Sequence, residues 1–204
     1  MRLDAGRATL VRRLVEIGAI RFGEFTLKSG ITSPFYIDLR VVISFPDVLA
    51  DIGATMADEV KRCGGDRIAG IPYAGLPLAV ATSLAAGIPL IYPRREDKSY
   101  GTKRRIEGVF VAGERVVLID DIITDGASKF EAIQPLEEAG LIVKDLVILI
   151  DREQGGRELL AAKGYALHAI LKISECFDEW ERTGAVEAGL LERSREFLQA
   201  TRFA

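Results

Sequence analysis

Two adjacent acids follow a short apolar run in the middle of the chain. Residues 116–119 are Val-Val-Leu-Ile, and Asp120 and Asp121 come directly after them. Neighbouring carboxylates repel each other, so such a pair is an unfavourable structural choice unless it holds a cation or a polyol. The chemistry that suits the pair is the binding of ribose hydroxyls beside a magnesium pyrophosphate.

The residues after the acids could bind a phosphate. They supply hydroxyls and a flexible backbone at the start of a predicted helix over 126–139, and they are Thr124, Asp125, Gly126, Ala127 and Ser128. Backbone N–H groups at a helix N-terminus attract anions. A strand-to-helix turn with a Ser or Thr cap is the common alternative. The combination of strand, acid pair and hydroxyl-glycine loop favours the phosphate site.

Two competing nucleotide-binding motifs are missing. The sequence has no GxGxxG, and Gly108 and Gly113 have the spacing of a Walker loop but are followed by Glu114 rather than lysine. Dinucleotide-binding and ATP-binding folds are therefore disfavoured.

A strongly basic segment lies between two predicted strands. From Arg94 to Arg105 the sequence has six basic and two acidic residues, whereas the whole chain has a net charge of −3. A solvated charged loop is the usual interpretation of such a run. The position beside the acid-bearing strand favours a lid, because its cations can stabilise a departing pyrophosphate while water is excluded.

The pattern of apolar runs predicts the sheet that would position these residues. Residues 67–71, 88–92, 116–119 and 146–150 are short apolar runs, and such continuous apolarity is typical of parallel strands covered on both faces. The chemistry of such sheets gathers at the carboxyl ends of the strands. The sequence therefore predicts an α/β fold, with helices at 4–20, 46–62, 74–86, 126–139, 156–163, 172–182 and 186–200 and further strands at 22–27, 35–39 and 165–170.

Composition limits the class of protein. With 204 residues, 49% hydrophobic and 28% charged, the chain reads as one globular domain over 1–204 with a small N-terminal hood at approximately 1–45. The acidic balance argues against a nucleic-acid partner. Cys63 and Cys176 are far apart, so neither a zinc site nor a disulfide framework is indicated. No segment is long and apolar enough to span a membrane, and we expect a cytoplasmic protein without a membrane partner.

Residues 116–128 resemble the binding motif of type I phosphoribosyltransferases. In that family the two acids hold the ribose 2- and 3-hydroxyls of 5-phosphoribosyl-1-pyrophosphate (PRPP), and the loop holds the 5-phosphate. The resemblance implies these roles for Asp120, Asp121 and the loop from Thr124 to Ser128. Asp125 stands where a small or hydroxyl residue is usual, and its charge would repel phosphate unless it points outward.

The basic segment is similar to the catalytic loop of orotate phosphoribosyltransferases, especially those that form the first half of bifunctional UMP synthases. The resemblance implies that Arg94, Arg95 and Lys98 contact pyrophosphate, with Lys98 as the main catalytic cation beside the two acids. Tyr100 stands where many bacterial members have a histidine. The resemblance also implies a homodimer in which the loop from 94 to 105 reaches the neighbouring active site. The single histidine, His168, is expected to be a core or surface residue.

Three further segments carry the resemblance to orotate enzymes. Residues 28–30 and 33–36 resemble the N-terminal substrate segment, with Lys28 on orotate or pyrophosphate and Phe35 and Tyr36 against the pyrimidine. Residues 71–75 resemble the pyrophosphate loop, in which Tyr73 contacts the donor, and Ala74 replaces a lysine of some members. In residues 151–156, Arg152 would pair with the substrate carboxylate as a bidentate donor.

The resemblance implies the conversion of orotate and PRPP, with Mg²⁺, to orotidine 5′-monophosphate and pyrophosphate in pyrimidine synthesis. It assigns no side chain as a direct metal ligand, because Mg²⁺ enters with the pyrophosphate and ribose. The acceptor would contact Lys28, Phe35, Tyr36, Thr124 and Arg152. Two alternatives remain open, namely a phosphoribosyltransferase for another base, such as uracil or a purine, and a PRPP-binding regulator without catalysis.

Overall fold

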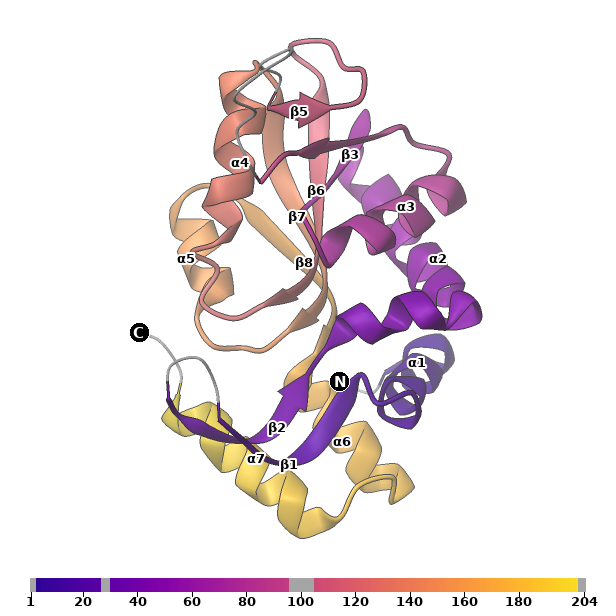
Figure 1. The fold of residues 1–204 in the computed structure, drawn as a ribbon, viewed down its shortest axis with the longest axis vertical. Coiled ribbons are helices and arrows are strands. Elements are labelled where there is room, and N and C mark those ends of the chain that lie inside the picture. Colours follow the sequence, from indigo (N-terminus) through magenta and orange to yellow (C-terminus); the bar gives the residue numbers. More distant parts are fainter. Residues whose placement is uncertain (1–2, 27–29, 96–104, 202–204) are drawn as a thin grey trace.

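The computed structural model describes residues 3–26, 30–95 and 105–201. Its centre is a sheet with the strand order β5-β4-β3-β6-β7-β8 (Figure 1). All neighbouring strands are parallel except β4 and β5. The strands are β3 (Arg67–Gly70), β4 (Leu90–Pro93), β5 (Ile106–Glu107), β6 (Arg115–Ile123), β7 (Ile142–Asp151) and β8 (Ala166–Lys172). The predicted α/β fold with a mostly parallel sheet is confirmed.

Helices cover both faces of this sheet. In Figure 1, α2 (Pro46–Cys63) and α3 (Gly75–Ala86) lie on one side, and α4 (Lys129–Glu138) and α5 (Gly156–Ala162) lie on the other. Val117 and Ile119 of β6 belong to one buried apolar cluster, whereas Val116 and Leu118 belong to the other. Successive side chains of a strand point to opposite faces, so a strand that is buried on both faces is apolar throughout.

A hood built from both ends of the chain completes the molecule. It contains the antiparallel pair β1 (Ile20–Thr26) and β2 (Thr32–Ile37) with α1 (Ala5–Glu16), α6 (Ile173–Thr183) and α7 (Ala188–Ala200). The ring of Phe35 lies at its centre, 5.5 Å from the ring of Phe177 and 6.1 Å from that of Phe197. The expected hood of approximately 1–45 is therefore only one part of it. A 3-10 helix, Leu39–Ser44, joins β2 to α2.

Several element boundaries differ from the sequence-based expectations, and the differences in the first helix and in β6 have clear causes. The first helix ends at Glu16 rather than near Ile20, because Gly18 has a φ of 73° and turns the chain into β1. β6 continues to Ile123, because residues beyond Ile119 still pair with β7. Both acids therefore lie inside a strand instead of after it.

Two further features concern membrane-spanning helices and cysteines. Among the described residues, no helix is both long and apolar enough to cross a bilayer. The thiols of Cys63 and Cys176 are free, the first half-buried and the second buried.

Candidate functional site

The candidate site lies where the order of strands reverses. β4 pairs with one side of β3, and β6 pairs with its other side. Ligands of open α/β sheets bind at the carboxyl ends of the strands at such a point. A hollow of about 430 Å³ opens there, and its lining includes Tyr73, Arg94, Arg95, Asp120, Asp121 and Ser128. The predicted acid pair, loop and basic segment meet at this hollow.

The two acids have different environments. Asp120 is buried, and its Oδ1 accepts a hydrogen bond from the backbone N–H of Asp121 at 2.9 Å. Asp121 is half-buried, and its Oδ1 accepts from the N–H of Ile122 at 2.8 Å. Burial, followed by the nearby charge of Asp120, raises the pKa of Asp121 to about 7. The ionised form of Asp121 is therefore disfavoured by its surroundings.

A lysine that the sequence reasoning missed holds Asp120. The ammonium of Lys129 lies 2.5 Å from Asp120 Oδ2 and 2.8 Å from the carbonyl oxygen of Ile122. Lys129 is the first residue of α4. A cation at a helix N-terminus opposes the helix dipole, and this unfavourable placement was the signal available in the sequence.

The loop after the acids is tightly packed and carries its own anion. The exposed Asp125 turns its carboxylate back to accept the N–H of Ala127 at 3.1 Å. Gly126 has a φ of 81°, and a Cβ there would lie 3.2 Å from Gly156. Thr124 accepts the N–H of Gly156 through its carbonyl oxygen at 3.0 Å. The loop is therefore fixed against α5, and Asp125 occupies one N–H that an anion could use.

The opposite wall of the hollow belongs to the loop after β3 and to the start of the basic segment. Tyr73 is 61% exposed, and the guanidinium of Arg95 lies 5.7 Å from the centre of its ring. Arg94 instead pairs with Glu107 at 2.9 Å. A Cβ on Gly75 would lie 2.8 Å from Asp120 Oδ1, so glycine lets α3 approach the acid pair.

Arg152 lies at the end of β7, where the sheet meets the hood. Its guanidinium carbon is 5.1 Å from the centre of the Phe35 ring, and its buried Nε has no hydrogen-bond partner in the described part of the chain. Burial lowers the pKa of the Arg152 guanidinium. The carboxylate of the neighbouring Glu153 accepts the N–H of Ser174 at 3.0 Å.

The structure does not bring Tyr36 to the same place as Phe35. Neighbouring residues of β2 point to opposite faces. The centre of the Tyr36 ring lies 5.5 Å from the guanidinium carbon of Arg21 and 5.6 Å from the centre of the Phe25 ring. Phe35, in contrast, lies beside Arg152. The two aromatic residues therefore do not present a common surface to one flat ring.

The remaining predicted positions fall elsewhere. Lys28, Lys98 and Tyr100 lie outside the described residues. His168 is held between Asp145 at 2.9 Å and Glu59 at 3.4 Å, on the early part of β8 and away from the acid pair.

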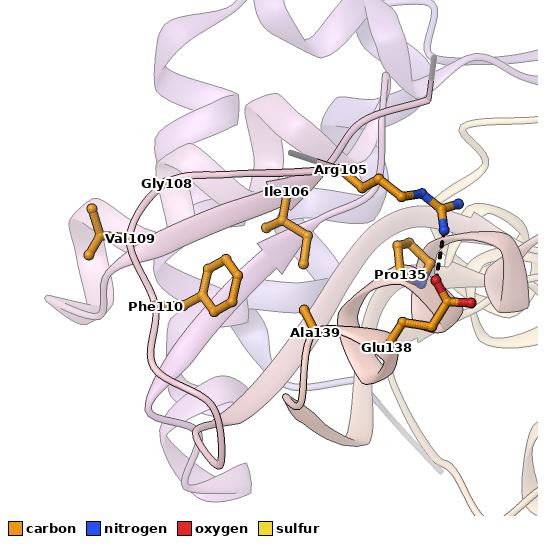
Figure 2. A pocket seen from close by; sticks show the side chains of 8 residues that line it. All are labelled: Arg105, Ile106, Gly108, Val109, Phe110, Pro135, Glu138 and Ala139. Carbon is orange, nitrogen blue, oxygen red and sulfur yellow. Dashed lines mark hydrogen bonds and ion pairs between the residues drawn. The ribbon is translucent and has the colours of Figure 1, made fainter. Parts of the chain in front are cut away.

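A second cavity, of about 600 Å³, lies beside α4 (Figure 2). Figure 2 shows apolar side chains along it, among them Ile106, Phe110 and Pro135, and an ion pair of 2.7 Å between Arg105 and Glu138. It contains neither of the predicted acids. The hollow at the strand reversal is therefore the candidate active site.

No family model matches the chain, but curated relatives and solved structures do. The chain is 39% identical to bovine uridine 5′-monophosphate synthase over 202 residues, which are 98% of the chain but 42% of that protein. It is 41% identical to the orotate phosphoribosyltransferase of Halobacterium salinarum over 169 residues, covering 83% of the chain and 95% of that protein. The structure of Leishmania donovani UMP synthase matches with a TM-score of 0.88 and 40% identity, over 97% of this chain and 43% of that one.

The doubly wound sheet, the acid pair and the adjoining loop, together with these similarities, define a type I phosphoribosyltransferase fold. The match to nearly the whole length of a single-function relative is more specific. The chain belongs to the orotate phosphoribosyltransferase family. It spans less than half of the bovine synthase.

Proposed function

We propose that the chain transfers the phosphoribosyl group of PRPP to orotate, giving orotidine 5′-monophosphate and pyrophosphate in the synthesis of UMP. Family membership supports the reaction class, and the environment of Arg152 carries the choice of acceptor.

Arg152 is a half-buried cation whose buried Nε has no hydrogen-bond partner among the described residues. Its guanidinium carbon lies 5.1 Å from the centre of the Phe35 ring. A buried guanidinium without a counter-charge is costly, and a carboxylate satisfies it best through paired hydrogen bonds. Orotate brings such a carboxylate, whereas uracil and the purines do not. This favours orotate over the other bases.

The donor fits the acid pair and the loop. Asp120 and Asp121 would accept hydrogen bonds from ribose hydroxyls, and the backbone from Thr124 to Ser128 would hold the 5-phosphate at the start of α4. Asp121 offers hard carboxylate oxygen beside the hollow, which suits Mg²⁺ carried on the pyrophosphate. When bound, the ion neutralises pyrophosphate charge.

Catalysis then consists of orientation and charge stabilisation. Orotate is already an anion, so no side-chain nucleophile is required. Arg95, exposed beside Tyr73, and Lys98 would stabilise the departing pyrophosphate. Arg94 would do so from a fixed position, because Glu107 holds its guanidinium. The rest of the basic loop would exclude water from the ribosyl cation.

We also propose a homodimer in which the loop from 94 to 105 acts at the neighbouring site. The apolar surface of α3 is the observation that supports a second copy of this chain as the partner. Residues 75–86 contain no charged side chain, yet Val80 is 45% and Leu84 80% exposed. They border an apolar groove of about 600 Å³ with Pro46 and Leu49 of α2. Exposed apolar patches of this kind mark interaction surfaces.

One assay tests the proposal. The protein is mixed with orotate, PRPP and Mg²⁺, and loss of orotate absorbance is followed, with uracil and adenine as parallel acceptors. The proposal predicts consumption of orotate alone. Consumption of uracil or adenine would favour another base, and PRPP binding without any turnover would favour the regulator.

A further inference from the structure

A buried lysine next to the acid pair has no role in the reaction described so far. The side chain of Lys129 is 7% exposed, and Lys129 is the one basic residue classed as buried among the described residues. Removing an ammonium from water is costly unless well-placed partners compensate for it. Lys144 of β7 is exposed, so its ammonium stays in water and bears no such cost.

The contacts of Lys129 fix the buried acid from one side. Its Nζ donates to Asp120 Oδ2 at 2.5 Å and to the carbonyl oxygen of Ile122 at 2.8 Å. From the other side, Asp120 Oδ1 accepts the N–H of Asp121 at 2.9 Å and lies against Gly75. The orientation of Asp120 therefore depends on Lys129.

The same contacts close the phosphate loop at its base. Asp120 and Ile122 belong to the end of β6, whereas Lys129 begins α4. The intervening residues, 124–128, form the loop expected to hold the 5-phosphate. One side chain thus joins the segment that would bind ribose to the helix that would bind phosphate.

We propose that Lys129 is a positioning residue for PRPP, orienting Asp120 toward the ribose and holding the two ends of the 124–128 loop together; this rests on the phosphoribosyl transfer proposed above. An ionised carboxylate has about four lone-pair sites, so Asp120 keeps acceptor sites for hydroxyls while it binds Lys129. Lys129 itself does not touch the reacting atoms.

Lys129→Met tests the inference, because methionine keeps an unbranched chain but removes the charge. We expect the KM for PRPP to rise by about tenfold or more, and the KM for orotate to change by less than about twofold. Lys144→Met is the matched control, and we expect it to keep the wild-type KM for PRPP and for orotate. An unchanged KM for PRPP in folded Lys129→Met would overturn the inference.

A double variant tests whether the lost stability of Lys129→Met comes from the unpaired charge of Asp120. Lys129→Met leaves a buried acid without its counter-charge, which is strongly destabilising, whereas removing both charges is much less so. Asp120→Asn with Lys129→Met should therefore unfold at a higher temperature than Lys129→Met alone, yet still bind PRPP weakly. Wild-type PRPP affinity in the double variant would contradict a positioning role.

Calorimetric titration with PRPP and Mg²⁺, without orotate, separates this inference from the proposed function. A wild-type protein that binds PRPP but consumes no orotate would contradict the proposed reaction, and the comparison with Lys129→Met would still decide the positioning role. Equal PRPP affinity in the two proteins would refute that role even where orotate is consumed.

Discussion

At the scale of single residues, Asp121 carries an unfavourable charge. Its pKa is raised from 3.8 to about 7, first by burial and then by Asp120. For an acid whose pKa is raised in the folded state, the contribution to stability is fully present below pH 3.8 and is lost as pH rises through 7.

Asp121→Asn should therefore be more stable than the wild type at pH 8, by roughly 2 to 4 kcal/mol. The difference should disappear toward pH 4, because the wild-type carboxyl is then protonated. Thermal unfolding across this range measures it, with Asp58→Asn on the exposed side of α2 as control. The same pH dependence in the wild type and Asp121→Asn would contradict the assignment.

Asp125 is expected to weaken PRPP binding. Its carboxylate occupies the N–H of Ala127 and adds negative charge to the loop. Asp125→Ser should lower the KM for PRPP by about twofold to fivefold, as expected for removal of an exposed like-charge interaction, and the gain should shrink at high salt. Asp125→Asn keeps an oxygen that can accept the N–H of Ala127 but removes the negative charge. It therefore distinguishes the effect of charge repulsion from the effect of the occupied N–H. A higher KM in both variants would show that the carboxylate assists binding.

The chemistry of residue types predicted much of the candidate site. The acid pair, Tyr73 and Arg95 meet at one hollow, because parallel strands bring their carboxyl ends to one edge. The placement of Lys129 at a helix start was the one signal in the sequence, but its contact with Asp120 could not be predicted, because the sequence does not show that the side chain turns back to the end of β6. The separation of Phe35 from Tyr36 follows from strand geometry, and the residue types alone suggested a shared aromatic surface.

At the scale of elements, the close packing of α5 against β6 shapes the loop. A Cβ on Gly156 would lie 2.6 Å from Ile123 Cγ1 and 2.7 Å from the carbonyl oxygen of Thr124. Gly156→Ala should cost about 1 to 3 kcal/mol of stability, as overpacking does, and should raise the KM for PRPP. Denaturant unfolding and steady-state kinetics measure both effects. Gly189→Ala in α7, with no neighbour closer than 3.7 Å, is the control, and equal behaviour of the two variants would contradict this packing.

The sheet could be predicted from the sequence. Of the hood, only the N-terminal part could be predicted. Continuous apolar runs reflect burial on both faces, a local pattern that identifies parallel strands. The hood depends on ring contacts between Phe35 and residues 177 and 197, and such distant pairings leave no local periodicity.

At the scale of the whole molecule, a shared active site predicts complementation between inactive subunits. Lys98→Ala would disable the loop, and Asp121→Asn would disable the acid pair. A mixed dimer would contain one site with both parts intact, so random exchange should restore about a quarter of wild-type activity. Activity is measured after the two variants are unfolded and refolded together. No recovery despite confirmed mixed dimers would show that each loop serves its own subunit.

Arg152 lies between the hood and the strand that carries the acid pair, because its backbone N–H donates to the carbonyl oxygen of Ile123 at 3.0 Å. Phe35 of the hood packs on Arg152 at the end of β7, while the acid pair lies on the adjacent strand β6. The central claim is therefore that Arg152 selects a carboxylated pyrimidine.

The most direct test compares kcat/KM for orotate in the wild type, Arg152→Met and the exposed control Arg193→Met. We expect kcat/KM for orotate to fall about a hundredfold or more in Arg152→Met, equal to ~3 kcal/mol, because the orotate carboxylate loses its charged partner. The KM for PRPP should stay unchanged, and Arg193→Met should match the wild type. Wild-type kcat/KM for orotate in Arg152→Met would contradict the proposed role of Arg152.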